Sequence, residues 1–288
     1  MAFSIAGLNP LTANISLPIG VFDSGMGGLT VLSALRASMP AEDFVYLGDT
    51  ARLPYGTKTP STVRRYATQA AQQLVARGVK ALVVACNTAS AFALEHLQHE
   101  FAPLPVFGVV SPGAEAALNH ADDSGVLVLA TESTIHGGAY QRALTGSGKG
   151  FPIYGRACPL WVTLAEQGPT DVTLTEAILS HSLRGFTNNG PHTVLLGCTH
   201  FPVFRQVLEE ILAREVSGPV VVVDSAQTTA DMVEGALRSS ELLLSEQGGD
   251  VSREGVTRYL ATDGVARFAQ IGGYFLGTDI ANVELVDL

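Results

Sequence analysis

The sequence predicts an α/β protein whose strands form mainly parallel sheets. Short runs of consecutive apolar residues, rich in Val and Leu, recur along the chain, and such runs are typical of strands buried on both faces. Longer amphipathic segments separate them, and this alternation of strand and helix favours the α/β class. The expected strands lie at 19–22, 44–47, 81–85, 106–110, 125–130, 193–197 and 220–223.

The segments between the strands are expected to be helices. The best marked one runs from Ser61 to Arg77, with Ser61 as a candidate N-cap and Gly78 directly after its end. The other expected helices lie at about 29–39, 89–100, 132–145, 171–186, 203–215 and 228–245.

Length and composition bound the class of protein. The chain has 288 residues, of which 47% are hydrophobic and 15% are charged, so it can bury one large core or two of ordinary size. The formal net charge of −10 argues against nucleic acid as a partner, because phosphate binding usually needs a basic surface. A small anionic substrate is compatible with this charge, since a few N–H groups and hydroxyls can bind it locally.

Cysteine content and the first residues bear on the cellular location. Cys86, Cys158 and Cys198 make an odd count, which favours a reducing cytoplasm, and none stands in a CxxC pair that would suggest a metal site. Residues 1–18 contain no Lys or Arg, so we expect an N-terminal extension rather than a signal peptide. No apolar run is long enough to span a membrane.

Polar residues gather where the expected strands end. Ligands of parallel α/β sheets bind beyond the carboxyl ends of the strands, so these side chains are expected to face one edge. Each one alone could equally be an ordinary N-cap of the following helix. The residues are Asp23-Ser24, Asp49-Thr50, Cys86-Asn87-Thr88, Thr131-Glu132, Cys198-Thr199-His200 and Asp224-Ser225.

Two of the cysteines occupy such strand ends. Cys86 and Cys198 each stand at the start of a predicted helix, where a thiolate is favoured. Each could instead be a small buried apolar residue, which is the interpretation that we adopt for Cys158. The short spacing between Cys198 and His200 does not prove contact, and Glu166 taken alone is interpreted as a solvated helix end.

The glycine-rich stretch "FDSGMGGLT" (22–30) has some features of a dinucleotide-binding turn. That motif has Gly or Ala where this chain has Thr30, and Asp23 would place negative charge near the pyrophosphate. No nucleotide cofactor is therefore expected. We interpret the glycines as letting a smaller anion come close to the backbone.

Short words recur in the two halves of the chain. "VFDSG" (21–25) and "VVDSA" (222–226) each place Asp-Ser after an apolar run, and "ACNT" (85–88) and "GCTH" (197–200) each place a cysteine there. Two related halves or coincidence would each explain these words.

Seven segments in order carry a family resemblance. They are "IGVFDSGMGGLTVL", "YLGDTARLPYGTK", "ALVVACNTAS", "TESTIHGGAYQRAL", "ACPLWVTLAEQG", "LLGCTHFP" and "VVDSAQTTA". Over about residues 19–240 the chain resembles the cofactor-independent aspartate/glutamate racemase family. "LGDTARLPYGTK" and "GCTHFP" are most similar to the glutamate racemases of that family.

The resemblance implies two α/β domains with mainly parallel sheets and an active site in the cleft between them. The first domain is expected at 1–110 plus 225–288, and the second is expected to be inserted at 111–224. Cys86 and Cys198 would then face each other across the cleft. The resemblance also implies a bacterial cytoplasmic enzyme without a cofactor, which supplies D-glutamate for peptidoglycan and forms a homodimer.

Two thiols suit the reaction that the family performs. Racemisation removes the α-proton from one face of the substrate and returns a proton to the other, so two acid–base groups are needed. A thiol, with a reference pKa of about 8.5, can serve as acid or base near neutral pH. The family implies that Cys86 deprotonates D-glutamate with help from Asp23, and that Cys198 deprotonates L-glutamate with help from His200 and Glu166.

The resemblance also implies which groups hold the substrate. Backbone donors, hydroxyls and an amide suit the carboxylates, and the Asp23 carboxylate suits the ammonium. Many relatives have two acids where this chain has Glu166 and Gln167, so which acid assists Cys198 stays open. The expected substrate contacts are Asp23, Ser24, Tyr55, Gly56, Asn87, Thr88, Thr199 and His200.

Three other functions compete with this one. A racemase of aspartate or another amino acid would act on a substrate that differs by as little as one methylene. A cysteine hydrolase built on Cys198 and His200 would leave Cys86 idle. A protein that only binds an amino acid would not need two thiols at strand ends.

Overall fold

The computed structural model describes residues 15–186, 188, 190–244 and 253–288, and within them two parallel sheets. This confirms the predicted α/β class with parallel sheets. The strands are β1 (Ile19–Asp23), β2 (Phe44–Gly48), β3 (Ala81–Val84), β4 (Val106–Gly108), β5 (Val126–Ala130), β6 (Ile153–Ala157), β7 (Thr193–Gly197), β8 (Val221–Asp224), β9 (Thr257–Ala261) and β10 (Val283–Leu285).

The helices lie between the strands along the chain. The α-helices are α1 (Leu29–Ser38), α2 (Pro60–Ala76), α3 (Asn87–Glu100), α4 (Val110–Leu118), α5 (Glu132–Gly137), α6 (Ala139–Thr145), α7 (Pro159–Ala165), α8 (Val172–Leu183), α9 (Arg205–Glu215), α10 (Ala226–Ser239) and α11 (Val265–Leu276). Two short 3₁₀ helices are η1 (Tyr55–Thr57) and η2 (Phe201–Phe204).

The two sheets repeat one strand order. The first sheet runs β10-β9-β2-β1-β3-β4 and the second runs β6-β5-β7-β8, so β1–β4 and β5–β8 are arranged alike. Cys86 follows the third strand of the first set and Cys198 follows the third strand of the second. The recurring cysteine words therefore occupy equivalent positions. The Asp-Ser words do not, because Asp23 ends a first strand whereas Asp224 ends a fourth.

Burial on both faces explains the continuous apolar runs. In β5, Val126 and Val128 pack with α4 and α6, whereas Leu127 and Leu129 join the core formed with α7, α8 and α9. The first sheet is covered in the same way, by α2 and α3 on one face and by α1, α10 and α11 on the other. Since successive side chains of a strand point to opposite faces, a strand between two helical layers needs an apolar residue at every position.

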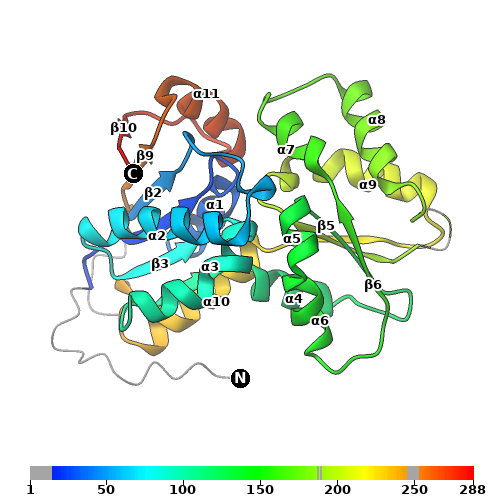
Figure 1. Cartoon of the computed structure of the whole chain (residues 1–288), viewed down its shortest axis with the longest axis horizontal. Helices are drawn as coiled ribbons and strands as arrows, with labels where there is room; N and C mark the ends of the chain where they lie inside the picture. Colours follow the sequence, from blue (N-terminus) through cyan, green and yellow to red (C-terminus); the bar gives the residue numbers. More distant parts are fainter. Residues whose placement is uncertain (1–14, 187, 189, 245–252) are drawn as a thin grey trace.

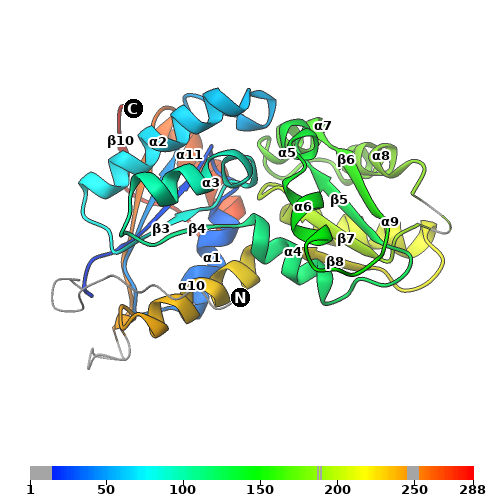
Figure 2. The same ribbon diagram turned by 60° about the horizontal axis from the view of Figure 1, so that its bottom comes forward.

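The two sheets lie side by side, as Figure 1 shows, and the chain crosses between them twice. The strands of the second sheet fall between residues 126 and 224, and those of the first sheet fall before and after that interval. Helix α4 lies on the way into the second half, and α10 returns to pack beside α1 (Figure 2). The predicted domain limits at 110/111 and 224/225 agree with this division of strands and stay a prediction as exact boundaries.

Several elements differ from the expected ones. Helix α2 begins one residue earlier, because the hydroxyl of Thr59 rather than Ser61 accepts the capping bond and Pro60 occupies the first turn. The expected helix 132–145 is broken at Gly138, whose φ of 64° ends α5 and precedes α6. The expected strand 106–110 ends at Gly108, and its last residues begin the neighbouring helix, α4.

The sequence interpretation missed β6, β9, β10, α4, α7 and α11. Strand β6 is a half-exposed edge strand, and its sequence "IYGRA" has no continuous apolar run. Helix α11 contains Gly272 and Gly273, which weaken its helical pattern. A Cβ at Gly272 would lie 2.9 Å from Leu29 Cδ1, so this glycine lets α11 pack closely on α1. Most of the expected N-terminal extension, residues 1–14, lies outside the described residues.

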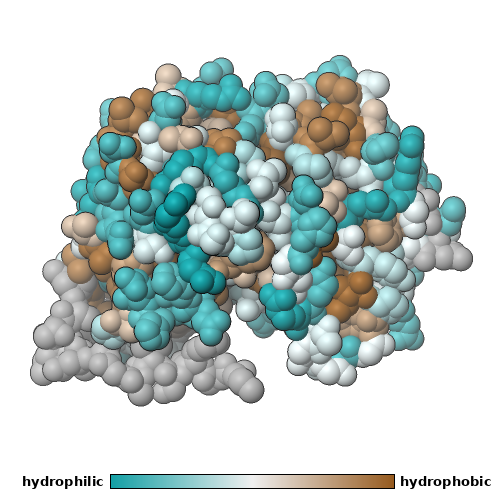
Figure 3. Space-filling view, viewed as in Figure 1, coloured by the Kyte–Doolittle hydropathy of each residue, from teal (hydrophilic) through white to brown (hydrophobic). Residues whose placement is uncertain are grey.

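The surface in Figure 3 is largely hydrophilic, with an apolar patch over α7 and α8. Leu160, Val172 and Leu174 of these helices are 61%, 62% and 54% exposed. In the part of the chain that the structure describes, no helix has both the length and the apolar character needed to cross a membrane.

Candidate active site

The carboxyl ends of both sheets border one small cavity of about 290 Å³. It brings together nine of the eleven residues expected at the site, and both Cys86 and Cys198 line it. Asp23 and Glu166 do not line it; each lies behind a residue that does. The lining residues are Ser24, Pro54, Tyr55, Gly56, Cys86, Asn87, Thr88, Thr131, Val162, Cys198, Thr199 and His200.

Cys86 lies between the end of β3 and the first turn of α3. Its Sγ accepts a hydrogen bond from the Ala89 N–H at 3.4 Å, and its thiol donates to Ser24 Oγ at 3.5 Å. Burial and the nearby Asp23 nevertheless raise the pKa of Cys86 to about 12, although its hydrogen bonds with Ser24 and Ala89 oppose this shift. The thiolate-favouring effect expected of the helix N-terminus is therefore outweighed by burial and by Asp23, and the raised pKa favours the neutral thiol of Cys86.

Asp23 and Asn87 each bring an unpaired oxygen to this side of the site. Asp23 is fully buried and its Oδ2 accepts from the Gly25 N–H at 2.9 Å. Burial raises the pKa of Asp23, against the opposing effects of His200 and of backbone N–H groups. Asn87 donates through Nδ2 to Tyr140 Oη at 2.6 Å. Asp23 Oδ1 and Asn87 Oδ1 are both buried and have no hydrogen-bond partner among the described residues.

Cys198 has a different partner at the end of β7. His200 Nδ1 lies 3.8 Å from Cys198 Sγ, and Nε2 of the same ring lies 3.0 Å from Glu166 Oε1. Burial alone would lower the pKa of His200, but its bonds to Cys198 and Glu166 raise that pKa to about 10. His200 is therefore an imidazolium at neutral pH. The acid that the structure brings to His200 is Glu166.

The glycine-rich stretch makes room for the loop that follows β7. A Cβ at Gly27 would lie 2.3 Å from His200 Nδ1 and 2.7 Å from Thr199 Oγ1. Thr30, the residue that departs from the dinucleotide motif, donates through its hydroxyl to the Thr199 carbonyl at 3.2 Å. The close neighbours of Gly27 are therefore side chains of the protein itself. The interpretation that the glycines of this stretch let an anion approach the backbone stays a prediction.

Tyr55, Gly56 and Thr88 line the cavity from the first half of the chain, and Gly56 and Thr88 meet Thr131 of the second half. The Tyr55 hydroxyl donates to Asp49 Oδ2 at 2.5 Å, and burial together with Asp49 raises the pKa of Tyr55 far above its usual value. A Cβ at Gly56 would lie 2.5 Å from Thr131 Cβ. The Thr88 hydroxyl lies 3.0 Å from the Thr131 hydroxyl. Both contacts join the two halves of the chain at the edge of the cavity.

Thr131 is a lining residue that the sequence analysis noticed but did not select. Thr131 follows β5, which corresponds to β1 in the repeated strand order. Because Asp23 ends β1, this correspondence was the sequence signal that could have identified Thr131 as a lining residue. No sequence feature marked Pro54 or Val162 as a residue that lines the cavity. Asp224, which ends β8, instead pairs with Arg205 at 2.6 Å and does not line the cavity. Cys158 is buried in the core, as expected for a small apolar residue.

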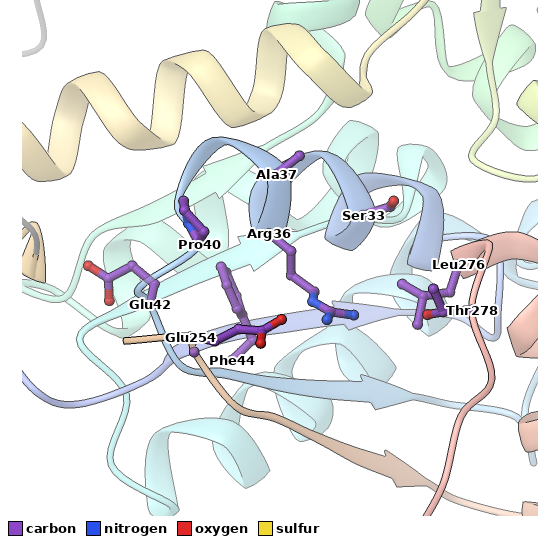
Figure 4. A pocket seen from close by; sticks show the side chains of 10 residues that line it. Ser33, Arg36, Ala37, Pro40, Glu42, Phe44, Glu254, Leu276 and Thr278 are labelled. Atoms are coloured by element: carbon purple, nitrogen blue, oxygen red, sulfur yellow. The ribbon is translucent and has the colours of Figure 1, made fainter. Parts of the chain in front are cut away.

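A second cavity, of about 600 Å³, lies away from the thiols. Figure 4 shows Arg36 extending into it from α1, with Glu254 nearby. None of the expected site residues lines this cavity. In the described residues, no three His, Cys, Asp or Glu side chains gather as metal ligands would.

The fold and the site define the class of the protein. Two parallel sheets of like topology present one thiol each to a shared cavity, with a carboxylate behind one thiol and an imidazolium beside the other. Such a site can exchange protons with either face of a small bound molecule.

Comparison with known proteins agrees with this class. The Asp/Glu/Hydantoin racemase family model matches residues 26–233. A glutamate racemase from Geobacter metallireducens is 44% identical over 272 residues, which cover 94% of this chain and 96% of that protein. The chain belongs to this racemase family, among its glutamate racemases, and is an amino-acid racemase.

Solved structures show the same fold. A glutamate racemase isoform from Bacillus anthracis aligns with a TM-score of 0.87 and 32% identity, covering 96% of this chain and 99% of that one. A Francisella tularensis glutamate racemase in complex with D-glutamate aligns with a TM-score of 0.83 and 31% identity, covering 95% and 98% respectively.

Proposed function

We propose that this protein interconverts L- and D-glutamate by proton transfer between the α-carbon and two thiols. One observation carries the proposal: Cys86 and Cys198 come from different sheets and line the same cavity. Two acid–base groups on opposite sides of one small cavity are what inversion at a carbon requires. The relatives named as glutamate racemases support glutamate as the substrate.

The unlike surroundings of the thiols support distinct resting roles. A positively charged His200 ring beside Cys198 would stabilise the thiolate that forms during turnover, whereas burial and Asp23 raise the pKa of the Cys86 thiol. In the L-to-D direction, the Cys198 thiolate takes the α-proton of L-glutamate and becomes a thiol. The Cys86 thiol then gives its proton to the opposite face of the carbanion and becomes a thiolate. The reverse turnover, or proton exchange with water, restores the starting state.

The polar groups of the cavity support binding of an amino acid with two carboxylates. Asn87 Oδ1 at the cavity and Asp23 Oδ1 behind it are buried acceptors without a hydrogen-bond partner among the described residues, and an ammonium group would satisfy them. Ser24, Thr88 and Thr199 offer hydroxyl groups at the same cavity, and these suit carboxylate oxygens.

We further propose the cellular setting that the family implies. The enzyme acts in the cytoplasm as a homodimer and supplies D-glutamate for peptidoglycan. The apolar side chains exposed on α7 and α8 are compatible with a contact between subunits. Light scattering on the purified protein tests the dimer, and a monomeric mass would contradict it.

A polarimetric assay tests the reaction and the substrate. We expect L-glutamate to lose its optical rotation in the presence of the purified protein without any added cofactor. Aspartate tested in parallel should react far more slowly. Unchanged rotation of L-glutamate with folded protein would refute the proposal, and faster loss with aspartate would reassign the substrate.

A further inference from the structure

One face of α11 lies against the groups that surround Cys198. Arg267, Ile271 and Phe275 are spaced four residues apart, so they lie along one face of this helix. Helix α11 packs with the first sheet, and it lies outside the residues 26–233 that the family model matches. Its contacts across the cleft are therefore a feature that the family motifs do not cover.

Arg267 contacts the loop of Glu166, Phe275 contacts the ring of His200, and Ile271 lies beside Gly168 of the same loop. Arg267 Nη2 donates to the backbone carbonyl of Glu166 at 2.7 Å. Ile271 Cδ1 lies 3.3 Å from the point that a Cβ of Gly168 would occupy. The Phe275 ring meets the His200 ring edge-on, with centroids 5.3 Å apart and planes at 78°.

These contacts restrict where the two groups behind Cys198 can lie. Glu166 caps the C-terminus of α7, where backbone carbonyls lack helical partners and a cation is favoured. The Arg267 guanidinium supplies both a donor and a positive charge at that point. Holding the backbone at 166 would restrict the direction of the Glu166 side chain, and the nearly perpendicular packing of Phe275 would restrict the plane of the imidazole.

We propose that the Arg267–Ile271–Phe275 face of α11 positions Glu166 and His200 for proton transfer at Cys198. The inference rests on the proposed racemisation and adds to it. Because α11 packs with the first sheet while Glu166 and His200 belong to the second half, this positioning is complete only when the two halves are together. The three side chains are positioning residues, because none of them lines the thiol cavity.

Rates alone cannot reveal a defect in one half of the reaction. The equilibrium constant between enantiomers is one, so kcat/KM must change equally in both directions. Primary deuterium isotope effects do separate the halves. When transfer at Cys198 is slowed, removal of deuterium from α-deuterated L-glutamate becomes more rate-limiting. Removal of deuterium from α-deuterated D-glutamate by Cys86 becomes less rate-limiting, because the slowed step then follows it.

The test compares Arg267→Ala, Arg267→Lys and Phe275→Leu with Gln270→Ala. Gln270 is an exposed residue of α11 outside the face defined above, which makes it a matched control. We expect Arg267→Ala and Phe275→Leu to lower kcat/KM by about 10- to 100-fold. The isotope effect should rise with labelled L-glutamate and fall with labelled D-glutamate. Arg267→Lys should keep most activity, since an ammonium can donate to the same carbonyl.

The outcomes separate this inference from the proposed function. Equal changes of both isotope effects, or unchanged rates in Arg267→Ala, would overturn the role of α11 while leaving the racemase intact. Arg267 is exposed, so its replacement tests the inference even if Phe275→Leu does not fold. A wild-type protein that does not racemise glutamate at all would refute the proposed function itself.

Discussion

The ring of His200 lies between two acidic groups, with Nδ1 3.8 Å from Cys198 Sγ and Nε2 3.0 Å from Glu166 Oε1. Among the residues that the structure describes, the charged neighbour of Cys86 is Asp23, an acid that raises the pKa of its thiol. The two thiols thus occupy opposite electrostatic environments. In the proposed mechanism, this difference suits Cys198 to accept a proton and Cys86 to donate one when L-glutamate is the substrate.

Replacing either thiol of the cavity should abolish efficient racemisation. We expect Cys86→Ser and Cys198→Ser each to lower kcat by roughly 10²- to 10⁴-fold, because a hydroxyl is a much weaker acid and base than a thiol. Cys158→Ala is the control, since Cys158 is buried but does not line the cavity. Full activity in either serine variant would remove that cysteine from the mechanism.

Glu166 should set the pH range in which His200 is charged. The raised pKa of about 10 means that the imidazolium persists through neutral pH and is lost as the pH rises through that value. Glu166→Gln keeps the shape and the hydrogen-bond acceptor but removes the negative charge. We expect the pKa of His200 to fall, and the alkaline limb of the pH–rate profile to move to lower pH. An NMR titration of the His200 ring measures the shift directly, and an unchanged value would show that the carboxylate charge does not control it.

Gly27 should be essential for the approach of the loop that follows β7. A Cβ there would lie 2.3 Å from His200 Nδ1, so Gly27→Ala should displace His200 and lower kcat/KM by more than about 10-fold. Gly235→Ala provides the contrast, because it lies inside α10 and a Cβ there meets no atom within 4 Å. That variant should keep full activity and gain about 0.5–1 kcal/mol of stability, measured by urea unfolding. An active Gly27→Ala protein would show that the loop has room to move.

The buried pair of Lys80 and Glu42 should contribute to stability through its charge balance. The Lys80 Nζ lies 2.5 Å from Glu42 Oε2, and both side chains are 2% exposed. Glu42→Gln leaves the buried lysine charge with the Ile15 and Leu242 carbonyls but without its counter-ion, and we expect the free energy of unfolding to fall by about 3 kcal/mol. In the exposed pair of Arg77 and Glu284, Glu284→Gln should cost less than about 1 kcal/mol. Similar losses in both variants would mean that burial of the pair is unimportant.

Much of the fold follows from local sequence features. Strands covered by helices on both faces need an unbroken apolar run, and the expected strands corresponding to β1–β5, β7 and β8 had one. β6 and β10 are edge strands with little burial, so no such run marks them. Helix α11 forms despite Gly272 because close packing on Leu29 outweighs the low helix propensity of glycine, and local propensity cannot reveal a tertiary contact.

The sequence predicted those site residues whose side-chain type reveals their chemistry. It did not predict properties that depend on burial in the folded chain. Strand ends and the family motifs indicated Cys86 and Cys198. The raised pKa of Cys86 was not predictable, because it arises from burial and from Asp23, which are properties of the folded chain. The contact of Glu166 with His200 likewise joins residues 34 positions apart in sequence.

Isotope incorporation in the first moments of reaction in deuterated water tests the two-thiol account most directly. Different thiols serve the two faces, so the D-glutamate formed from L-glutamate should carry deuterium at the α-carbon. The L-glutamate that has not yet reacted should carry none. D-glutamate that retains the original α-proton, or deuterium appearing equally fast in the remaining L-glutamate, would indicate a single base and contradict the account.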